Sequence, residues 1–127
     1  MARFLWICLG GAAGTGARYL VSLWAAGAFG TNFPIGTLLV NVIGSFLLTF
    51  VMYVAGTTGV MGEDLRLALT AGVFGGFTTY STFNYETTQL FRTGAWATGS
   101  LNLAVTVLGC LLSGLAGFAL ARLVVGR

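Results

Sequence analysis

The stretch Gly72-Val73-Phe74-Gly75-Gly76-Phe77-Thr78-Thr79-Tyr80-Ser81-Thr82-Phe83-Asn84 decides how the rest of the chain is interpreted. It begins with three glycines in five residues and continues with four Ser or Thr hydroxyls, a phenol and a Phe ring. A helix in a bilayer keeps such residues only where they face protein, water or an ion. We therefore predict a broken helix that holds the functional site, with the other segments as its support.

The composition around this stretch is that of an integral membrane protein. Of the 127 residues, 57% are hydrophobic and only 7% are charged, whereas a soluble domain carries about a quarter charged residues. A membrane-spanning helix needs roughly 20 apolar residues, so at most about four or five spans fit in the chain. Almost no residues remain for a soluble domain. We predict one all-α transmembrane domain over residues 1–127.

The apolar runs predict four membrane-spanning helices, at about residues 4–27, 35–54, 65–91 and 95–125. The third is long enough to contain the interruption. In the first, Gly10 and Gly14 have the spacing that lets another helix approach closely, as do Ala12 and Gly16.

Polar residues form a stripe on each of two predicted spans. They recur every four residues and so share one helix face, at Thr37, Asn41, Ser45 and Thr49 in the second span and at Asn102, Thr106 and Cys110 in the fourth. An amide in hydrocarbon needs hydrogen-bond partners. Asn41 is therefore either a contact between helices, which is the commoner role, or a donor that faces a pore.

The distribution of charge bears on topology. Four spans place both termini and the loop at 56–64 on one side, together with Arg3, Arg66, Arg122 and Arg127, whereas Arg92 lies on the other side. Arg18, past the middle of the first span, either snorkels to the far interface or faces a watery vestibule. This weak positive-inside bias allows insertion in both orientations. Four thin helices also enclose a polar pathway poorly, and both points favour an oligomer.

The residues that are absent restrict the function. The chain has no His, which excludes Ser–His and Cys–His catalysis, and no predicted span holds paired carboxylates or a metal-ligating cluster. We therefore predict no enzymatic activity. The net charge of +3 is small and scattered, so nucleic acid is not an expected partner, whereas membrane lipid is.

A small four-helix proton-coupled multidrug exporter is the alternative to a passive pore. Such exporters usually carry a carboxylate in the first span, where this chain has Arg18 and no acid. Glu86, near the end of the third span, is the one candidate proton carrier. Proton relays are built from Asp, Glu and His, so a single peripheral Glu gives the exporter weak support.

The polar stretch itself suits an anion. Hydroxyl hydrogens and the positive rim of an aromatic ring can replace part of an anion's hydration shell, and Tyr80 and Phe83 flank two hydroxyl residues. The glycines before Thr78 are expected to free backbone carbonyls, which bind cations. A kink whose rings pack against neighbouring helices fits the composition equally well.

Three segments resemble the small dual-topology fluoride channels, the Fluc family. Residues 75–83 (GGFTTYSTF) resemble the family's glycine-rich, Thr-Thr-aromatic-Ser-Thr-Phe signature. Residues 36–46 (GTLLVNVIGSF) resemble its second-span motif, and residues 11–19 (GAAGTGARY) its first-span motif. The three motifs occur in order, and the resemblance covers nearly the whole chain.

This resemblance implies a fluoride-selective channel that passively exports cytoplasmic fluoride. It implies an antiparallel homodimer in the bacterial cytoplasmic (inner) membrane, with two pathways and a central structural sodium ion held by the backbone carbonyls of Gly75 and Thr78. It implies a fluoride pathway formed by Asn41, Tyr80, Ser81, Thr82, Phe83, Thr106, Cys110, Arg18 and Glu86. Tyr80 stands where the family usually has Phe, and Cys110 stands where Ser would be the better donor.

Overall fold

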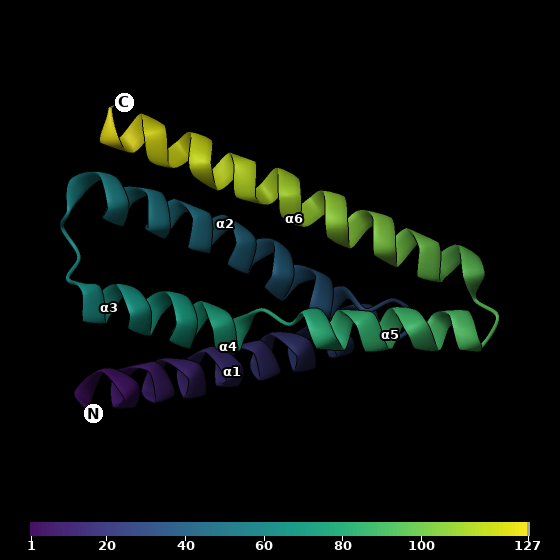
Figure 1. Cartoon of the computed structure of the whole chain (residues 1–127). Coiled ribbons are helices and arrows are strands. Elements are labelled where there is room, and N and C mark those ends of the chain that lie inside the picture. The colour runs from purple at the N-terminus through teal and green to yellow at the C-terminus, as the bar shows by residue number, and fades with distance from the viewer. Residues whose placement is uncertain (127) are drawn as a thin grey trace.

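The computed structural model describes residues 1–126, and within them every regular element is a helix (Figure 1). The elements are α1 (Ala2–Phe29), α2 (Ile35–Thr58), α3 (Glu63–Leu67), the π-helical η1 (Ala68–Phe74), α4 (Gly75–Phe77), α5 (Tyr80–Arg92) and α6 (Trp96–Val125). The chain runs the length of the molecule four times. Its third pass is divided into α3, η1 and α4 on one side of a break and α5 on the other, so the predicted broken helix is confirmed.

Three of the four predicted spans are single helices long and apolar enough to cross a membrane. These are α1, α2 and α6, with 28, 24 and 30 residues. At a rise of 1.5 Å per residue they measure about 36 to 45 Å, against a hydrocarbon core of about 30 Å. None of the helices of the third pass is long enough alone, because the break divides them.

Both ends of the described chain lie at one end of the molecule, beside the turn between α2 and α3 (Figure 1). Arg3 joins the start of α1 to the start of α3, since its guanidinium donates to Asp64 at 2.7 Å and to Glu63 at 3.2 Å. The three side chains are half exposed or more, so the ion pairs add little stability. Arg127, which the sequence analysis assigned to this side, lies outside the described residues.

The glycines of α1 and of the third pass bring two helix backbones into contact. A Cβ on Gly14 would overlap the carbonyl oxygen of Val73, and one on Gly10 would lie 2.5 Å from the carbonyl oxygen of Ala68. From the other side, a Cβ on Gly72 would lie 2.8 Å from the carbonyl oxygen of Ile7. The close approach predicted for Gly10 and Gly14 is confirmed. It does not extend to Gly16, which has open space beside it.

The glycines before Thr78, which were expected to free backbone carbonyls, do not themselves interrupt the helix. Gly75 has helical angles, φ −62° and ψ −37°, and helical turns continue to Phe77. The break lies instead at Thr78 and Thr79, which are both extended, with ψ of 157° and 100°. Gly72 and Gly76 are needed for their missing side chains at the contact with α1, not for an unusual backbone conformation.

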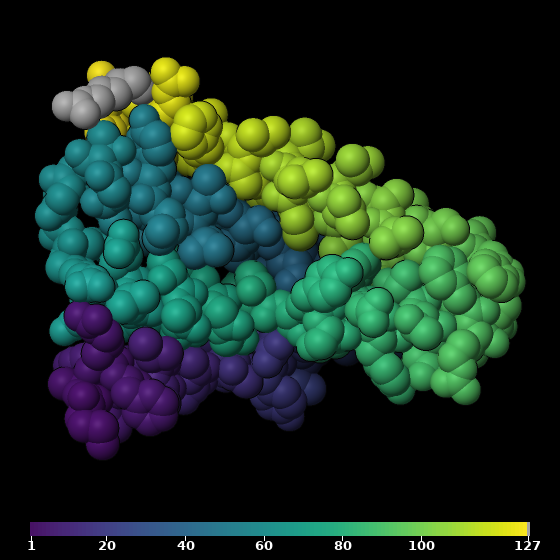
Figure 2. Space-filling model, in the orientation of Figure 1, coloured from purple at the N-terminus to yellow at the C-terminus, as the bar shows by residue number. Residues whose placement is uncertain are grey.

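The remaining long helices, α2 and α6, pack against each other. Figure 2 shows α6 lying over α2, with the third pass and α1 on the other side of α2. A Cβ on Gly117 would overlap the carbonyl oxygen of Phe46. The Ser113 hydroxyl donates to the carbonyl oxygen of Val42 at 2.7 Å. Large apolar side chains of α1 and α6 remain exposed, as expected of helices that face lipid.

The contact between α1 and the third pass should not tolerate one added methyl group. Gly14→Ala forces the Val73 carbonyl away and should cost about 1–3 kcal/mol as an overpacked contact. Gly27→Ala is the matched control, because Gly27 lies in the same helix with nothing near its Cβ position, and Ala favours a helix over Gly. Thermal unfolding in detergent should show a lower midpoint for Gly14→Ala alone. Equal midpoints would contradict the contact.

Candidate functional site

The centre of the site is the amide of Asn41, which replaces the hydrogen bonds that the break removes. Its Nδ2 donates to the carbonyl oxygen of Thr79 at 3.1 Å, and its Oδ1 accepts from the backbone N–H of Thr79 at 2.7 Å. Both residues are buried, with 8% and 6% of their surface exposed. Because an unpaired backbone group in apolar surroundings is costly, Asn41 is what allows an extended residue at this depth.

The same arrangement leaves the carbonyl oxygens just before α5 without helical donors, and those of Gly75 and Thr78 are two of them. The Thr79 N–H, which would bond to the carbonyl of Gly75 in a continuous helix, is taken by Asn41. The N–H of Thr82, the corresponding donor for Thr78, instead bonds to the Thr79 hydroxyl at 3.3 Å. Within residues 1–126, no backbone N–H donates to either carbonyl. Carbonyl oxygens freed in this way are typical ligands of alkali cations in broken membrane helices.

The first turn of α5 carries the predicted aromatic and hydroxyl residues. Thr79 caps the helix, and its hydroxyl also donates to the Thr82 hydroxyl at 2.8 Å. The rings of Tyr80 and Phe83 meet edge to face with centroids 5.8 Å apart. Phe83 is 4% exposed, whereas Tyr80 is 78% exposed. The pair therefore lies at the boundary between the inside of the chain and its surface.

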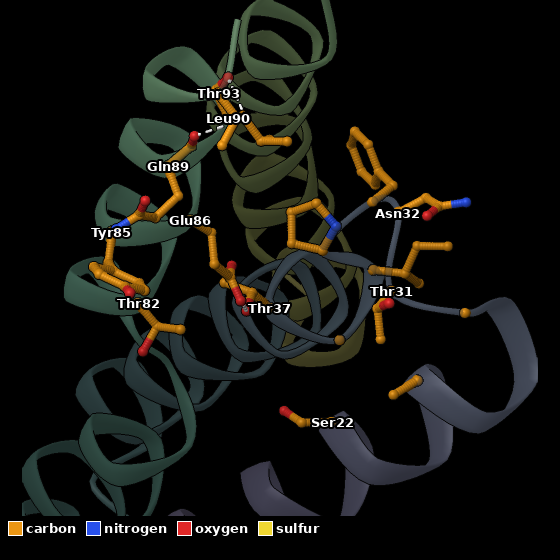
Figure 3. A pocket seen from close by; sticks show the side chains of 16 residues that line it. Ser22, Thr31, Asn32, Thr37, Thr82, Tyr85, Glu86, Gln89, Leu90 and Thr93 are labelled. Carbon is orange, nitrogen blue, oxygen red and sulfur yellow. Dashed lines mark hydrogen bonds between the residues drawn. The ribbon is translucent and has the colours of Figure 1, made fainter. Parts of the chain in front are cut away.

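A cavity of about 480 Å³ opens between α5 and the α1–α2 connection (Figure 3). Glu86 and Thr37 point toward each other at its wall, and the Thr37 hydroxyl donates to Glu86 Oε1 at 2.9 Å. Glu86 Oε2 is buried without a hydrogen-bond partner among residues 1–126. Thr82 lines the same cavity, so the cavity reaches from the end of the molecule to the first turn of α5.

Comparison with known proteins places this arrangement in a family. Residues 5–118 match the family model described as CrcB-like protein, Camphor Resistance (CrcB). The chain belongs to this CrcB-like family.

Curated relatives share nearly the whole length of this CrcB-like chain. One from Anaeromyxobacter dehalogenans is 56% identical over 126 residues, which are 99% of this chain and 100% of the relative. One from Sorangium cellulosum is 54% identical over 122 residues, 96% of each chain. One from Geobacter sulfurreducens is 46% identical over 96% of this chain and 98% of the relative. All three are named fluoride-specific ion channel FluC.

These comparisons confirm several of the sequence predictions. The resemblance to the fluoride channel family is confirmed, and none of the relatives' names is that of an enzyme. With its three long apolar helices, the CrcB-like chain is a multi-pass membrane protein. The multidrug exporter is not favoured.

The structure brings together only some of the predicted site residues. Asn41, Thr82 and Phe83 lie around the break, and Glu86 lies one turn further along α5. Arg18 is partly exposed on α1 and does not line the cavity, and neither do Thr106 and Cys110 on α6.

The sequence reasoning missed one buried contact of α5. The amide of Asn102 on α6 donates to the hydroxyl of Thr87 on α5 at 2.9 Å, and both side chains are buried. The four-residue stripe on the fourth span contained Asn102, so its helix face was predicted. Its partner on α5 was not, because periodicity does not identify the facing residue.

The double hydrogen bond of Asn41 predicts a large effect of a small change. Asn41→Asp loses the donor to the Thr79 carbonyl and sets a carboxylate oxygen against it, which should cost about 3 kcal/mol or more of stability. Ser45→Ala is the matched control on the same stripe, because the Ser45 hydroxyl donates only to its own helix, to the Asn41 carbonyl. Its loss should cost about 1 kcal/mol or less. Thermal unfolding in detergent that ranks the two variants equally would contradict the role of Asn41.

Proposed function

We propose that this protein is a fluoride-selective channel through which cytoplasmic fluoride leaves the cell passively. The observation that carries the proposal is its identity of 46% to 56%, over nearly the whole chain, with relatives named fluoride-specific ion channels. The geometry supports a pore for a small anion, because hydroxyls, an amide and two ring edges gather at one helix break. The donors at the break are weak and numerous, and none of them is a Lys or Arg charge that would trap the ion there.

The fluoride pathway is proposed to follow the first turn of α5 and the polar stripes that face it. Its members are Asn41, Tyr80, Ser81, Thr82, Phe83, Thr106, Cys110, Arg18 and Glu86. Asn41 can hold the break and still serve an anion, because an amide NH₂ carries two donors and one of them is used on Thr79. Tyr80 adds a phenol hydroxyl where its ring edge already offers a positive rim.

A sodium ion is proposed to bind at the carbonyl oxygens of Gly75 and Thr78. The residues fit this ion, since both carbonyls lack a backbone donor and uncharged oxygens suit a monovalent cation. When bound, the ion would join the end of the first half of the third pass to the start of the second half. Its role would then be structural, with the anion carried by the side chains that follow.

The channel is proposed to work as an antiparallel homodimer with two pathways. Tyr80 and Ser81 point out of a single chain, and the Tyr80 ring is 78% exposed. The exposed donors can line a pathway only if something encloses the ion from the opposite side, and a second copy of the chain would do so. The weak charge bias between the two ends of the molecule permits that copy to insert in the opposite orientation.

Proteoliposomes should release fluoride and retain chloride. Valinomycin and a potassium gradient supply the driving force, and electrodes selective for each anion follow the release. Asn41→Asp should abolish fluoride release, whereas Ser45→Ala should release it at about the wild-type rate. Equal release of both anions would contradict selectivity, and unaltered flux through Asn41→Asp would leave Asn41 a structural contact only.

Two further arms of that experiment separate the alternatives. A proton-coupled exporter would drive its substrate uphill in a pH gradient and lose this with Glu86→Gln, whereas a channel needs no proton gradient. Replacing sodium with N-methylglucamine from purification onward should reduce fluoride release if the carbonyls of Gly75 and Thr78 hold sodium. An unchanged rate would contradict the sodium site.

Labelling should find both orientations in one membrane. With Cys8 and Cys110 replaced by Ser, a single cysteine is placed at one end of the molecule as Thr31→Cys, and in a second variant at the other end as Val60→Cys. A membrane-impermeant maleimide added outside should label about half of each variant, as expected when neither orientation is preferred. Full labelling of one variant and none of the other would contradict the antiparallel dimer.

A further inference from the structure

The second half of the third pass, α5, is held by polar contacts at three places, two with α2 and one with α6. It has 13 residues and is separated from α4 by the extended pair at Thr78 and Thr79, so no continuous helix fixes its position. Its start is bonded to α2 through Thr79 and Asn41, and its middle is bonded to α2 through Glu86 and Thr37. On the side of α6, its polar contact is the hydrogen bond between Thr87 and Asn102.

Asn102 is one of the two largest fully buried side chains among the described residues, with 1% of its surface exposed. Its Nδ2 donates to the Thr87 hydroxyl at 2.9 Å, and that hydroxyl donates to the carbonyl oxygen of Phe83 at 2.7 Å. Its Oδ1 accepts from the Thr106 hydroxyl at 3.4 Å. One amide thus connects two proposed members of the fluoride pathway, Phe83 on α5 and Thr106 on α6.

The packing at the far end of α5 places Asn102 opposite Thr87. The Phe91 ring stacks on Trp96 with centroids 5.1 Å apart, and it also fills the space that a Cβ on Gly99 would need, 2.6 Å from that position. Asn102 lies three residues beyond Gly99, and Thr87 lies four residues before Phe91, so each is one helical turn along the same seam. The aromatic contact sets the register, and the hydrogen bond fixes the rotation of α5 within it.

We propose that Asn102 is a positioning residue of the fluoride pathway. Acting through the Thr87 hydroxyl, it holds the main chain of Phe83, and so directs the Phe83 ring and the first turn of α5 toward the ion. It does not itself touch the ion in this scheme. The inference rests on the proposed channel function and adds a residue pair that the pathway assignment does not contain.

The experiment removes the bond at either end and measures fluoride release per active channel. Asn102→Leu keeps the size of the side chain and removes the donor, and Thr87→Val keeps the shape and removes the hydroxyl. Thr87→Ser keeps the hydroxyl and is the conservative rescue. Ser113→Ala is the matched control, because it removes another hydrogen bond of α6, to the Val42 carbonyl on α2. At low protein density, the fraction of vesicles that empty counts active channels, and the speed of emptying gives the rate of each.

Asn102→Leu and Thr87→Val should each slow the rate per active channel at least tenfold, while vesicles still empty. The double variant should be no slower than either single variant, because both changes cut one connection. Thr87→Ser should stay within about twofold of wild type, and Ser113→Ala should leave the rate per channel unchanged.

Three results would overturn the inference. If fewer vesicles empty but each active channel runs at the wild-type rate, Asn102 stabilises the fold and nothing more. If the effects of the two variants multiply, Asn102 and Thr87 act separately. If both variants run at the rate of a working wild type, the hydrogen bond does not position the pathway. Should Asn102→Leu fail to fold, the comparison of Thr87→Val with Thr87→Ser decides. Wild-type vesicles that retain fluoride would overturn the proposed channel function itself. That result is distinct from failure of the positioning role, in which the wild type releases fluoride and the variants release it equally fast.

Discussion

The structure depends on one constraint, which is that a helix broken inside apolar surroundings must find new partners for its backbone. Asn41 meets it at Thr79, where one amide accepts from the N–H and donates to the carbonyl of the same residue. The extended conformation of Thr79 is tolerated in apolar surroundings because both of its backbone groups are paired. The Thr79 hydroxyl then caps α5, whereas the first half of the pass ends at Thr78.

The two halves of the third pass are held by different kinds of contact, which explains their different compositions. The first half is pressed against α1 by backbone contacts that only glycines allow, as between Gly14 and Val73. The second half has few such contacts and is tied by side-chain hydrogen bonds from Asn41, Thr37 and Asn102. A closely packed half thus stands beside a half whose position is set by directional hydrogen bonds, and the proposed site lies where they meet.

Much of this fold was predictable from the sequence because membrane-spanning helices consist of long apolar runs that are visible in it. The predicted runs at 4–27, 35–54 and 95–125 agree with α1, α2 and α6 to within a few residues. The break was predicted in the correct segment but attributed to its glycines, since sequence alone does not tell a glycine needed for close packing from one needed for an unusual backbone. The pairing of Asn41 with Thr79 was not predictable, because a stripe of polar residues identifies a helix face and leaves open which residue, 38 positions away, it meets.

The exposure of the α5 residues argues that one chain cannot enclose the proposed pathway. Residues three apart on a helix point about 60° from each other, so Tyr80 and Phe83 lie on adjoining sides of α5, and one ring is outside the chain while the other is inside. Ser81 is exposed as well. An ion that touches both rings therefore follows the edge of the chain, not its interior. The buried contacts of Phe83 and Asn41 form one wall of such a route, and whatever covers Tyr80 and Ser81 must form the other. A second copy of the chain fits that requirement, because it would bring the same hydroxyls and ring edges to the seam that the first copy leaves open.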